Sequence, residues 1–145
     1  MPEAGILDTS VVIDLPGIND DQLPAESAIT AVTMAELAAG PHAAADAIQR
    51  SIRQERLQWA EATFDPFPFD IAAARSYGRV YALVRAAQRQ PRGRFADLMI
   101  ASIAAANQLP LYTRNPTDFA GLDSLITVVA VRSPRNPQGV NPVDC

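Results

Sequence analysis

The sequence has no lysine and one cysteine, and each scarcity excludes a kind of chemistry. All 12 basic residues are arginine, so reactions that need a lysine ammonium group are excluded. The single thiol, Cys145, is the last residue, which excludes an internal disulfide framework and a zinc site built from cysteines. Because the only histidine is His42, a metal bound by this chain would have to take oxygen ligands.

Long hydrophobic runs are also missing. No apolar run approaches the roughly 20 residues that a membrane helix needs, and the start of the chain lacks the basic segment of a secretory signal. A length of 145 residues with 48% hydrophobic side chains is typical of one globular domain with its own core. We therefore expect a single cytoplasmic domain that does not associate with a membrane.

The net charge of −4 is unevenly distributed along the chain. Residues 1–46 hold eight acidic groups and no basic ones, whereas residues 47–96 hold nine arginines and four acids. A polyanion binds mainly through neutralised phosphates, so an acidic protein is an unusual partner for nucleic acid. The local excess of arginine in residues 47–96 is nevertheless compatible with binding to nucleic acid.

Apolar runs and helical periodicity alternate through residues 1–132. The patterns predict strands at 5–7, 28–32, 109–113 and 125–131. They predict helices at 11–15, from 33 to the Gly40-Pro41 pair, over 43–62, from 71 to the loop at 90–93, and over 95–107. This order favours an α/β fold with a central, mainly parallel sheet. Residues 133–145 form a separate Pro/Asn-rich tail in this interpretation.

Two of the predicted helices carry more detailed expectations. Ile48, Ile52 and Trp59 fall at near-helical spacing, which predicts a long amphipathic helix. Asp70 is placed to cap the following helix. The expected inner face of that helix carries Ile71, Ala74, Tyr77, Tyr81 and Val84.

Acidic residues follow the predicted strands. Asp8 comes directly after the first strand, Glu36 lies one turn past the second, and Asp118 lies five residues after Thr113. Asp97 is near the start of the helix that precedes the third strand. Ligands of an open parallel sheet gather at the carboxyl ends of its strands, so these side chains can meet at one edge.

Carboxylates gathered in this way repel one another unless a cation neutralises them. An all-oxygen ligand set selects Mg²⁺ or Mn²⁺ over zinc. Such an ion can acidify a bound water and stabilise negative charge on a phosphodiester. The residues therefore predict metal-assisted hydrolysis without a protein nucleophile.

Each acidic residue also has a purely structural explanation. Asp8 fits a turn at a strand end, and Glu36 completes a Thr-x-x-Glu capping box with Thr33. Asp97 would favour a helix dipole, and Asp118 could cap a short helix. The functional interpretation rests on the combination of the four residues.

Four segments resemble the motifs of PIN-domain ribonucleases, and together they span nearly the whole chain up to about residue 131. They are residues 6–14 (ILDTSVVID), 34–37 (MAEL), 95–101 (FADLMIA) and 111–119 (LYTRNPTDF). The length and the Thr-Arg-Asn-x-x-Asp-Phe form of the last motif are most similar to the VapC toxins of toxin-antitoxin systems. Pro116 within that motif and the tail after Ser133 depart from the family pattern.

The resemblance implies a three-layer α/β/α PIN domain over residues 1–132 and an Mg²⁺- or Mn²⁺-dependent endoribonuclease. It also implies a homodimer and inhibition by a cognate VapB-type antitoxin. By motif match, the catalytic residues and metal ligands would be Asp8, Glu36, Asp97 and Asp118. Thr9 or Ser10, and Thr113 or Asn115, would supply polar groups that support the ligands or contact the substrate.

Arginines crowd the ten residues before the third motif. If they flank the acidic residues, they would hold RNA phosphates on either side of the scissile bond. The residues concerned are Arg85, Arg89, Arg92 and Arg94. A solvated helix surface, or a contact with an acidic antitoxin segment, explains them equally well.

Other functions fit less well. A haloacid-type phosphatase and a phospho-receiver domain both need a lysine, and flavin or dinucleotide binding needs a Gly-rich turn where this chain has Asp8-Thr9-Ser10. The main alternative is a catalytically silent PIN-like module that binds RNA or a protein. Retention of all four acids favours the enzyme.

Overall fold

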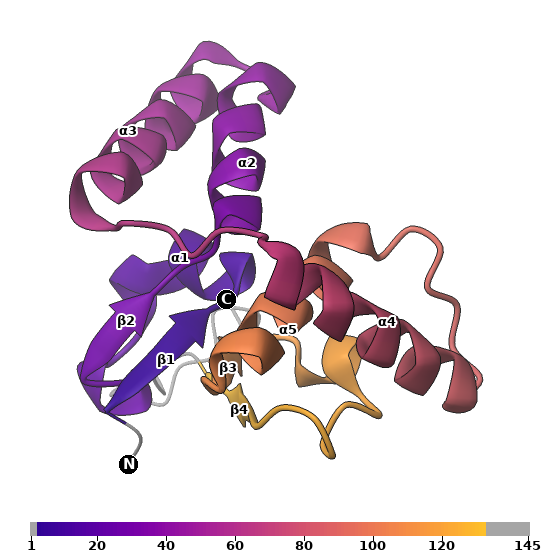
Figure 1. Cartoon of the computed structure of the whole chain (residues 1–145). Helices are drawn as coiled ribbons and strands as arrows, with labels where there is room; N and C mark the ends of the chain where they lie inside the picture. Colours follow the sequence, from indigo (N-terminus) through magenta and orange to yellow (C-terminus); the bar gives the residue numbers. More distant parts are fainter. Residues whose placement is uncertain (1–2, 133–145) are drawn as a thin grey trace, which may run out of the picture.

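A parallel four-stranded sheet forms the centre of the chain in the computed structural model, which describes residues 3–132 (Figure 1). The strand order is β2 (Glu26–Ala28), β1 (Ala4–Leu7), β3 (Leu111–Thr113) and β4 (Val128–Ala130). Every neighbouring pair is parallel, with Ile6 aligned with both Ala28 and Leu111. The predicted parallel sheet is confirmed, and the predicted tail at 133–145 lies outside the described residues.

Helices cover both faces of this sheet. Ile6 and Leu111 pack on α4 (Ile71–Ala86) and α5 (Phe95–Asn107). Their neighbours Leu7 and Tyr112 point the other way and pack with α1 (Thr9–Asp14) and α2 (Ala31–Ala39). Successive strand residues face opposite sides, so two hydrophobic cores enclose the sheet and the three-layer α/β/α fold is confirmed. No helix among residues 3–132 is long and apolar enough to cross a membrane.

Short 3₁₀ helices connect several of these elements. They are η1 (Leu15–Gly17), η2 (Asp20–Gln22), η3 (Gly40–Ala43) and η4 (Pro116–Phe119). The last of them follows β3 and carries Asp118, so the acidic residue that the sequence places after the third strand lies in a tight helical turn.

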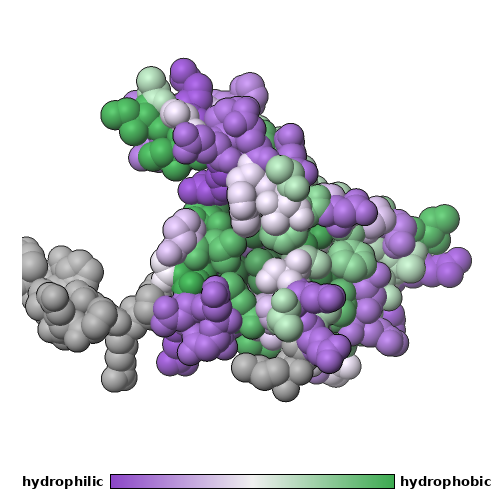
Figure 2. Space-filling model, turned by 90° about the vertical axis from the view of Figure 1, so that its left-hand side faces the viewer, coloured by the Kyte–Doolittle hydropathy of each residue, from purple (hydrophilic) through white to green (hydrophobic). Residues whose placement is uncertain are grey.

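Residues 31–63 form a hairpin of α2, η3 and α3 (Ala47–Thr63), which we call the arm. The arm stands out from the body of the molecule (Figures 1 and 2). The Arg53 guanidinium donates to the Gly40 carbonyl at 2.9 Å and ties its two helices together. The helix predicted from residue 43 begins at Ala47, because the Asp46 carboxylate accepts from the Gln49 N–H and caps it.

The second strand is displaced from its predicted position. The pattern placed it at 28–32, but β2 ends at Ala28 and α2 begins at Ala31. The Thr30 hydroxyl accepts from the Thr33 N–H at 3.1 Å, so Thr30 caps the helix. The alternative explanation of Glu36 by a capping box with Thr33 is therefore wrong, because both residues lie inside the helix.

The predicted inner face of α4 is also wrong in most positions. Its buried residues are Ala73, Ser76, Val80 and Val84. Ile71 and Tyr81 are 72% and 39% exposed, and Tyr77 is half-buried. Small side chains at Ala73 and Ser76 let α4 approach α5 closely, and this packing requirement outweighs hydrophobicity in setting the face.

The apolar side chains of α3 are exposed, although the apolar face of an amphipathic helix is usually buried against the core. Ile48 is 73% exposed, and Ile52 and Trp59 are each more than 40% exposed. Ala60 is the one fully buried residue of α3 within the described chain. The arm thus presents hydrophobic surface to its surroundings.

Gly5 and Gly78 give a matched pair of substitutions that tests the packing of the sheet. A Cβ at Gly5 would lie 2.5 Å from Cε1 of Tyr112, whose ring is buried, whereas a Cβ at Gly78 meets nothing within 4 Å. We expect Gly5→Ala to lower the free energy of unfolding by about 1–3 kcal/mol. Gly78→Ala should raise it by roughly 0.5–1 kcal/mol, because alanine favours the helix. Urea denaturation measures both, and an unchanged stability in Gly5→Ala would contradict the described packing.

Candidate active site

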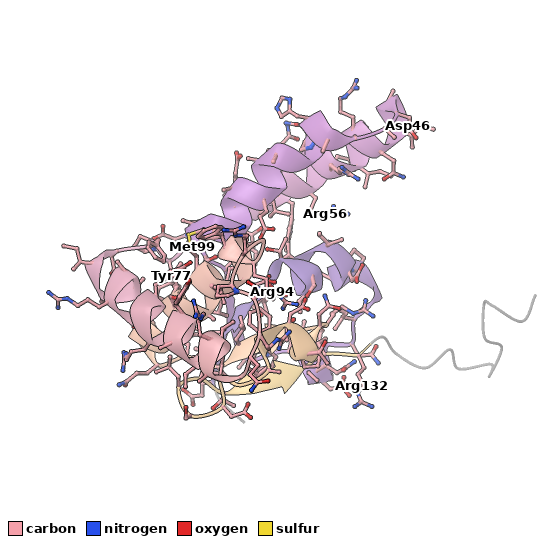
Figure 3. All side chains as sticks on the ribbon, turned by 90° about the vertical axis from the view of Figure 1, so that its right-hand side faces the viewer. Asp46, Arg56, Tyr77, Arg94, Met99 and Arg132 are labelled. Atoms are coloured by element: carbon pink, nitrogen blue, oxygen red, sulfur yellow. The ribbon has the colours of Figure 1, made fainter. Side chains whose placement is uncertain are left out.

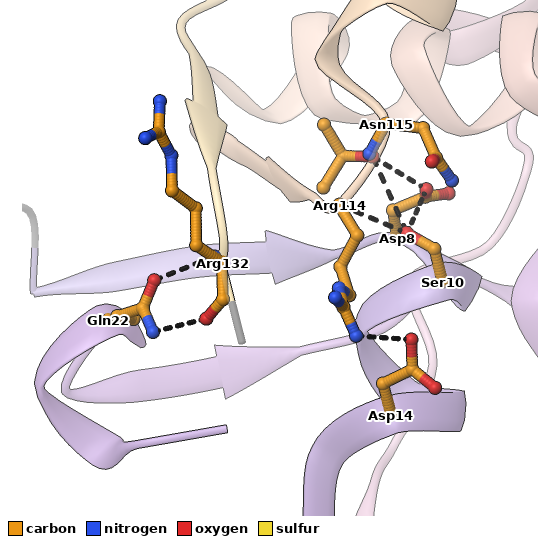
Figure 4. Close-up of polar contacts among 8 residues, drawn as sticks. Asp8, Ser10, Asp14, Gln22, Arg114, Asn115 and Arg132 are labelled. Atoms are coloured by element: carbon orange, nitrogen blue, oxygen red, sulfur yellow. Dashed lines mark hydrogen bonds and ion pairs between the residues drawn. The ribbon is translucent and has the colours of Figure 1, made fainter. Parts of the chain in front are cut away.

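Asp8 is the most buried of the four acidic residues, with 5% of its surface exposed. It follows β1, and its N–H donates to the Tyr112 carbonyl of β3 at 2.8 Å. Its carboxylate Oδ2 accepts hydrogen bonds from Ser10 Oγ at 2.8 Å and Thr113 Oγ1 at 2.9 Å (Figure 4). Two hydroxyl donors thus replace the water that an ionised carboxylate loses on burial.

Both hydroxyl oxygens also accept a hydrogen bond from the backbone. Ser10 Oγ accepts from the Arg114 N–H at 3.2 Å, and Thr113 Oγ1 accepts from the Asn115 N–H at 3.0 Å (Figure 4). The Arg114 guanidinium also pairs with Asp14 at 2.5 Å, which fastens the segment after β3 to α1. Each hydroxyl is therefore free to point its proton at Asp8. Of the predicted polar groups, Ser10 and Thr113 contact Asp8 directly, and Asn115 contributes its backbone N–H.

Glu36 is held by a chain of threonine hydroxyls. Thr9 Oγ1 donates to Glu36 Oε1 at 2.7 Å and lies 2.9 Å from Thr33 Oγ1, which in turn accepts from Thr30 at 3.5 Å. Because Thr9 gives its proton to Glu36, the proton in the Thr9–Thr33 bond must come from Thr33. Sequence reasoning assigned Thr33 to a helix cap and missed this contact, which depends on the true start of α2.

Asp97 lies in the first turn of α5 and interacts with all three other acids. Its pKa is raised from 3.8 to about 6, mainly by burial and then by the nearby carboxylates of Asp8, Asp118 and Glu36, while Arg94 lowers it. Three acids from different elements act on this carboxyl group because all of them lie near it. The structure thus brings together the four acids that the sequence singled out, and we call them the acidic cluster.

Asp118 lies in η4 and contacts an arginine. Its side chain is 41% exposed, and Arg94 Nη1 lies 3.8 Å from its Oδ1 and donates to its backbone carbonyl at 3.4 Å. The predicted arginines therefore separate into two groups. Arg94 lies beside the acidic cluster, whereas Arg85, Arg89 and Arg92 line a hollow at the end of α4.

Two arginines of the arm lie near Glu36. Arg53 and Arg56 line a hollow of about 380 Å³ together with Thr9 and Glu36. Figure 3 shows Arg56 on the arm and Arg94 on the body below it. From the sequence, Arg53 and Arg56 are only polar positions on a helix. Their approach to Glu36 depends on how α3 packs against α2, which local patterns do not predict. They are the charged residues near the cluster that sequence reasoning missed.

The chemistry of the cluster fits a hard cation. Its side chains offer carboxylate oxygens, and oxygen ligands suit Mg²⁺ and Mn²⁺. Within residues 3–132, however, no three acidic, histidine or cysteine side chains are already arranged as a metal-binding group. The carboxyl groups would therefore have to turn toward an ion to bind it together.

Comparison with known proteins gives close relatives. No protein-family model matches the chain. Ribonuclease VapC5 of Mycobacterium tuberculosis is 38% identical over 136 residues, which cover 90% of this chain and 96% of that protein. The crystal structure of VapBC-5 from the same organism, a member of the VapBC family of toxin-antitoxin systems, matches with a TM-score of 0.78 at 37% identity over 90% of this chain and 99% of the matched chain.

More distant structures share the fold. FitAcB from Neisseria gonorrhoeae matches with a TM-score of 0.67 at 25% identity over 93% of this chain and 99% of that chain. DNA-bound VapBC from Salmonella typhimurium gives a TM-score of 0.66 at 19% identity over 88% of this chain and 97% of its own. The described residues thus share the fold of these structures.

The raised pKa of Asp97 predicts a pH-dependent stability of the metal-free protein. A carboxyl group whose pKa is higher in the folded state stabilises the fold when protonated, and this contribution is lost as the pH rises from 3.8 to about 6. In chelator, Asp97→Asn should therefore melt a few degrees above the parent at about pH 8, and the difference should shrink toward about pH 4. Asp20→Asn, at an exposed acid of η2, is the charge-matched control. A difference that does not depend on pH would contradict the electrostatic origin of the shift.

Proposed function

Because this chain belongs to the VapC family of ribonucleases, we propose that it is the toxin of a toxin-antitoxin pair and hydrolyses RNA phosphodiesters with the help of Mg²⁺ or Mn²⁺. The observation that carries this proposal is the interaction of three carboxylates with Asp97 at the carboxyl edge of the sheet. Repulsion of this kind is costly to a fold, and a bound divalent cation would remove it. The four acids of the cluster are the proposed ligands and catalytic residues.

The ion, when bound, supplies Lewis-acid chemistry, because it acidifies water and stabilises negative charge on a phosphate. The chain itself orients the ligands. Ser10 and Thr113 both donate to one oxygen of Asp8, which leaves the other carboxylate oxygen for the ion. Thr9 does the same for Glu36. We therefore assign these three hydroxyls to positioning the ligands and the Asn115 side chain to substrate contact.

Arginines near two acids of the cluster support a phosphodiester substrate. Arg94 lies beside Asp118, and Arg56 lines the hollow next to Glu36. An RNA backbone that crosses the cluster would meet a guanidinium at each of these acids, so its flanking phosphates would be neutralised while the central one meets the ion.

The solved relatives that carry VapBC in their names are toxin-antitoxin complexes, and we extend that assembly to this chain. A VapB-type antitoxin would bind and inhibit it, and two copies would form a homodimer in the cytoplasm. The exposed apolar residues of α3 support a protein contact on the arm. So does an adjoining hollow of about 410 Å³, with a largely apolar lining that includes Val12, Leu15 and Trp59.

Replacing Asp8 tests the catalytic assignment. Asp8→Asn should lower the Mn²⁺-dependent cleavage of RNA by at least about 100-fold, since even outer partners of metal ligands are worth 10- to 100-fold. Cleavage of a mixed single-stranded RNA, followed with Mn²⁺ and with chelator, measures this effect. Asp20→Asn should cleave like the parent. Full activity of Asp8→Asn would refute the assignment, and an inactive parent that still binds RNA would point to a silent PIN-like module.

Thr113 tests the positioning role of the hydroxyls. Thr113→Val keeps the volume of the buried side chain but removes a donor to Asp8, so activity should fall by about 10- to 100-fold. Thr113→Ser keeps the hydroxyl and should retain most of the activity. Melting temperatures of both variants show whether the fold is intact. Equal activities in the two variants would mean that the Asp8 contact does not matter for the reaction.

A further inference from the structure

A hollow of about 940 Å³ lies at the end of α4, where the chain turns toward α5, and we call it the arginine hollow. Figure 1 shows the loop that carries it, between the end of α4 and the start of α5. Its lining contains no carboxylate. It consists of Tyr81, Arg85, Gln88, Arg89, Gln90, Pro91, Arg92 and Gly93. Three arginines therefore line one open space.

The positive charge of this hollow is not balanced by nearby acids. Among residues 3–132 the ion pairs are Arg94 with Asp118 and Arg114 with Asp14. None of the three arginines of the hollow belongs to either pair. Arg85 and Arg92 are exposed, so their side chains can reach a ligand. Like charges around one space repel one another, and an anionic ligand would offset that repulsion.

The arginine hollow is joined to the acidic cluster by the loop that carries Asp118. Arg89 donates to the carbonyls of Thr117 at 2.5 Å and Ala120 at 3.5 Å, on either side of Asp118. Arg94, two residues after Arg92, pairs with Asp118 itself. The hollow therefore borders the segment that carries Asp118, so a polyanion bound at Asp118 has a basic surface beside it.

The lining indicates which kind of polyanion fits. Guanidinium groups bind phosphates in pairs of hydrogen bonds, and the 39% exposed ring of Tyr81 offers a face on which a base can stack. Gln88 and Gln90 add amide groups that can bond to base edges. An acidic peptide would use the arginines but would have no use for an aromatic face and amides beside them.

We propose that the arginine hollow binds the single-stranded segment of RNA next to the scissile phosphodiester, with Arg85 and Arg92 on backbone phosphates and Tyr81 under an unstacked base. This inference rests on the proposed function, because it extends the substrate path from the acidic cluster. A duplex keeps its bases stacked inside the helix, so the hollow selects single strands.

The test measures binding of a fluorescently labelled, mixed-sequence single-stranded RNA to the full chain at several salt concentrations in chelator, where metal-dependent cleavage does not occur. Arg85→Gln combined with Arg92→Gln should weaken binding by about 10-fold and flatten the slope of log affinity against log salt by about 1.4, or 0.7 for each lost phosphate contact. Tyr81→Leu should weaken binding by at least about fivefold, and Tyr81→Phe should not.

Arg75→Gln combined with Arg79→Gln is the matched control, because both residues lie on α4 outside the hollow and the change in charge is the same. Equal losses in the two double variants would overturn the inference, as would an unchanged salt slope or equally tight binding of a duplex of the same length. Weakened binding of an acidic antitoxin peptide, with RNA binding unchanged, would also overturn it and assign the hollow to a protein.

Cleavage with Mn²⁺ is measured separately, so the two proposals can fail independently. If the parent does not cleave RNA but the Arg85→Gln, Arg92→Gln double variant shows a flatter salt dependence of RNA binding, the proposed reaction is contradicted and the hollow is supported as an RNA site. A parent that cleaves and shows the same salt slope in both double variants would contradict the hollow alone.

Discussion

Electrostatic repulsion among four carboxylates is the constraint around which this structure is arranged. The strands bring three acids from separate elements to the carboxyl edge of the sheet, where they act on Asp97 and, together with burial, raise its pKa. Hydroxyl donors offset part of that cost, since Asp8 accepts from Ser10 and Thr113. Nothing in the packing of the sheet requires acids at this place, so the cost indicates a function that needs their combined charge.

Much of this edge can be predicted from local sequence patterns. An apolar run followed at once by an acid placed Asp8 at the end of β1, and the bounds of α5 agree with the prediction at both ends. The alternation of strands and helices predicted the parallel sheet. These features can be predicted because each depends on a few neighbouring residues and on the one edge of the sheet at which all parallel strands end.

Features set by tertiary contacts could not be predicted in this way. Thr30 rather than Thr33 caps α2, because the chain pairs with Phe67 at Thr30 and then turns directly into the helix. The buried face of α4 follows close packing against α5 instead of hydrophobicity. The approach of Arg53 and Arg56 to Glu36 follows from the arm folding back on itself. Helical periodicity locates such side chains around a helix axis but gives no information about the element opposite.

Arginines thus accompany the acidic cluster at two of its members: arginines of the arm lie near Glu36, and Arg94 lies beside Asp118. This arrangement suits an ion in the cluster and a polyanion across it. Anomalous X-ray diffraction from crystals soaked in Mn²⁺ tests that ion site most directly. The account predicts a manganese peak bonded to carboxylates of the acidic cluster. Saturating Mn²⁺ with no peak among these side chains would contradict it.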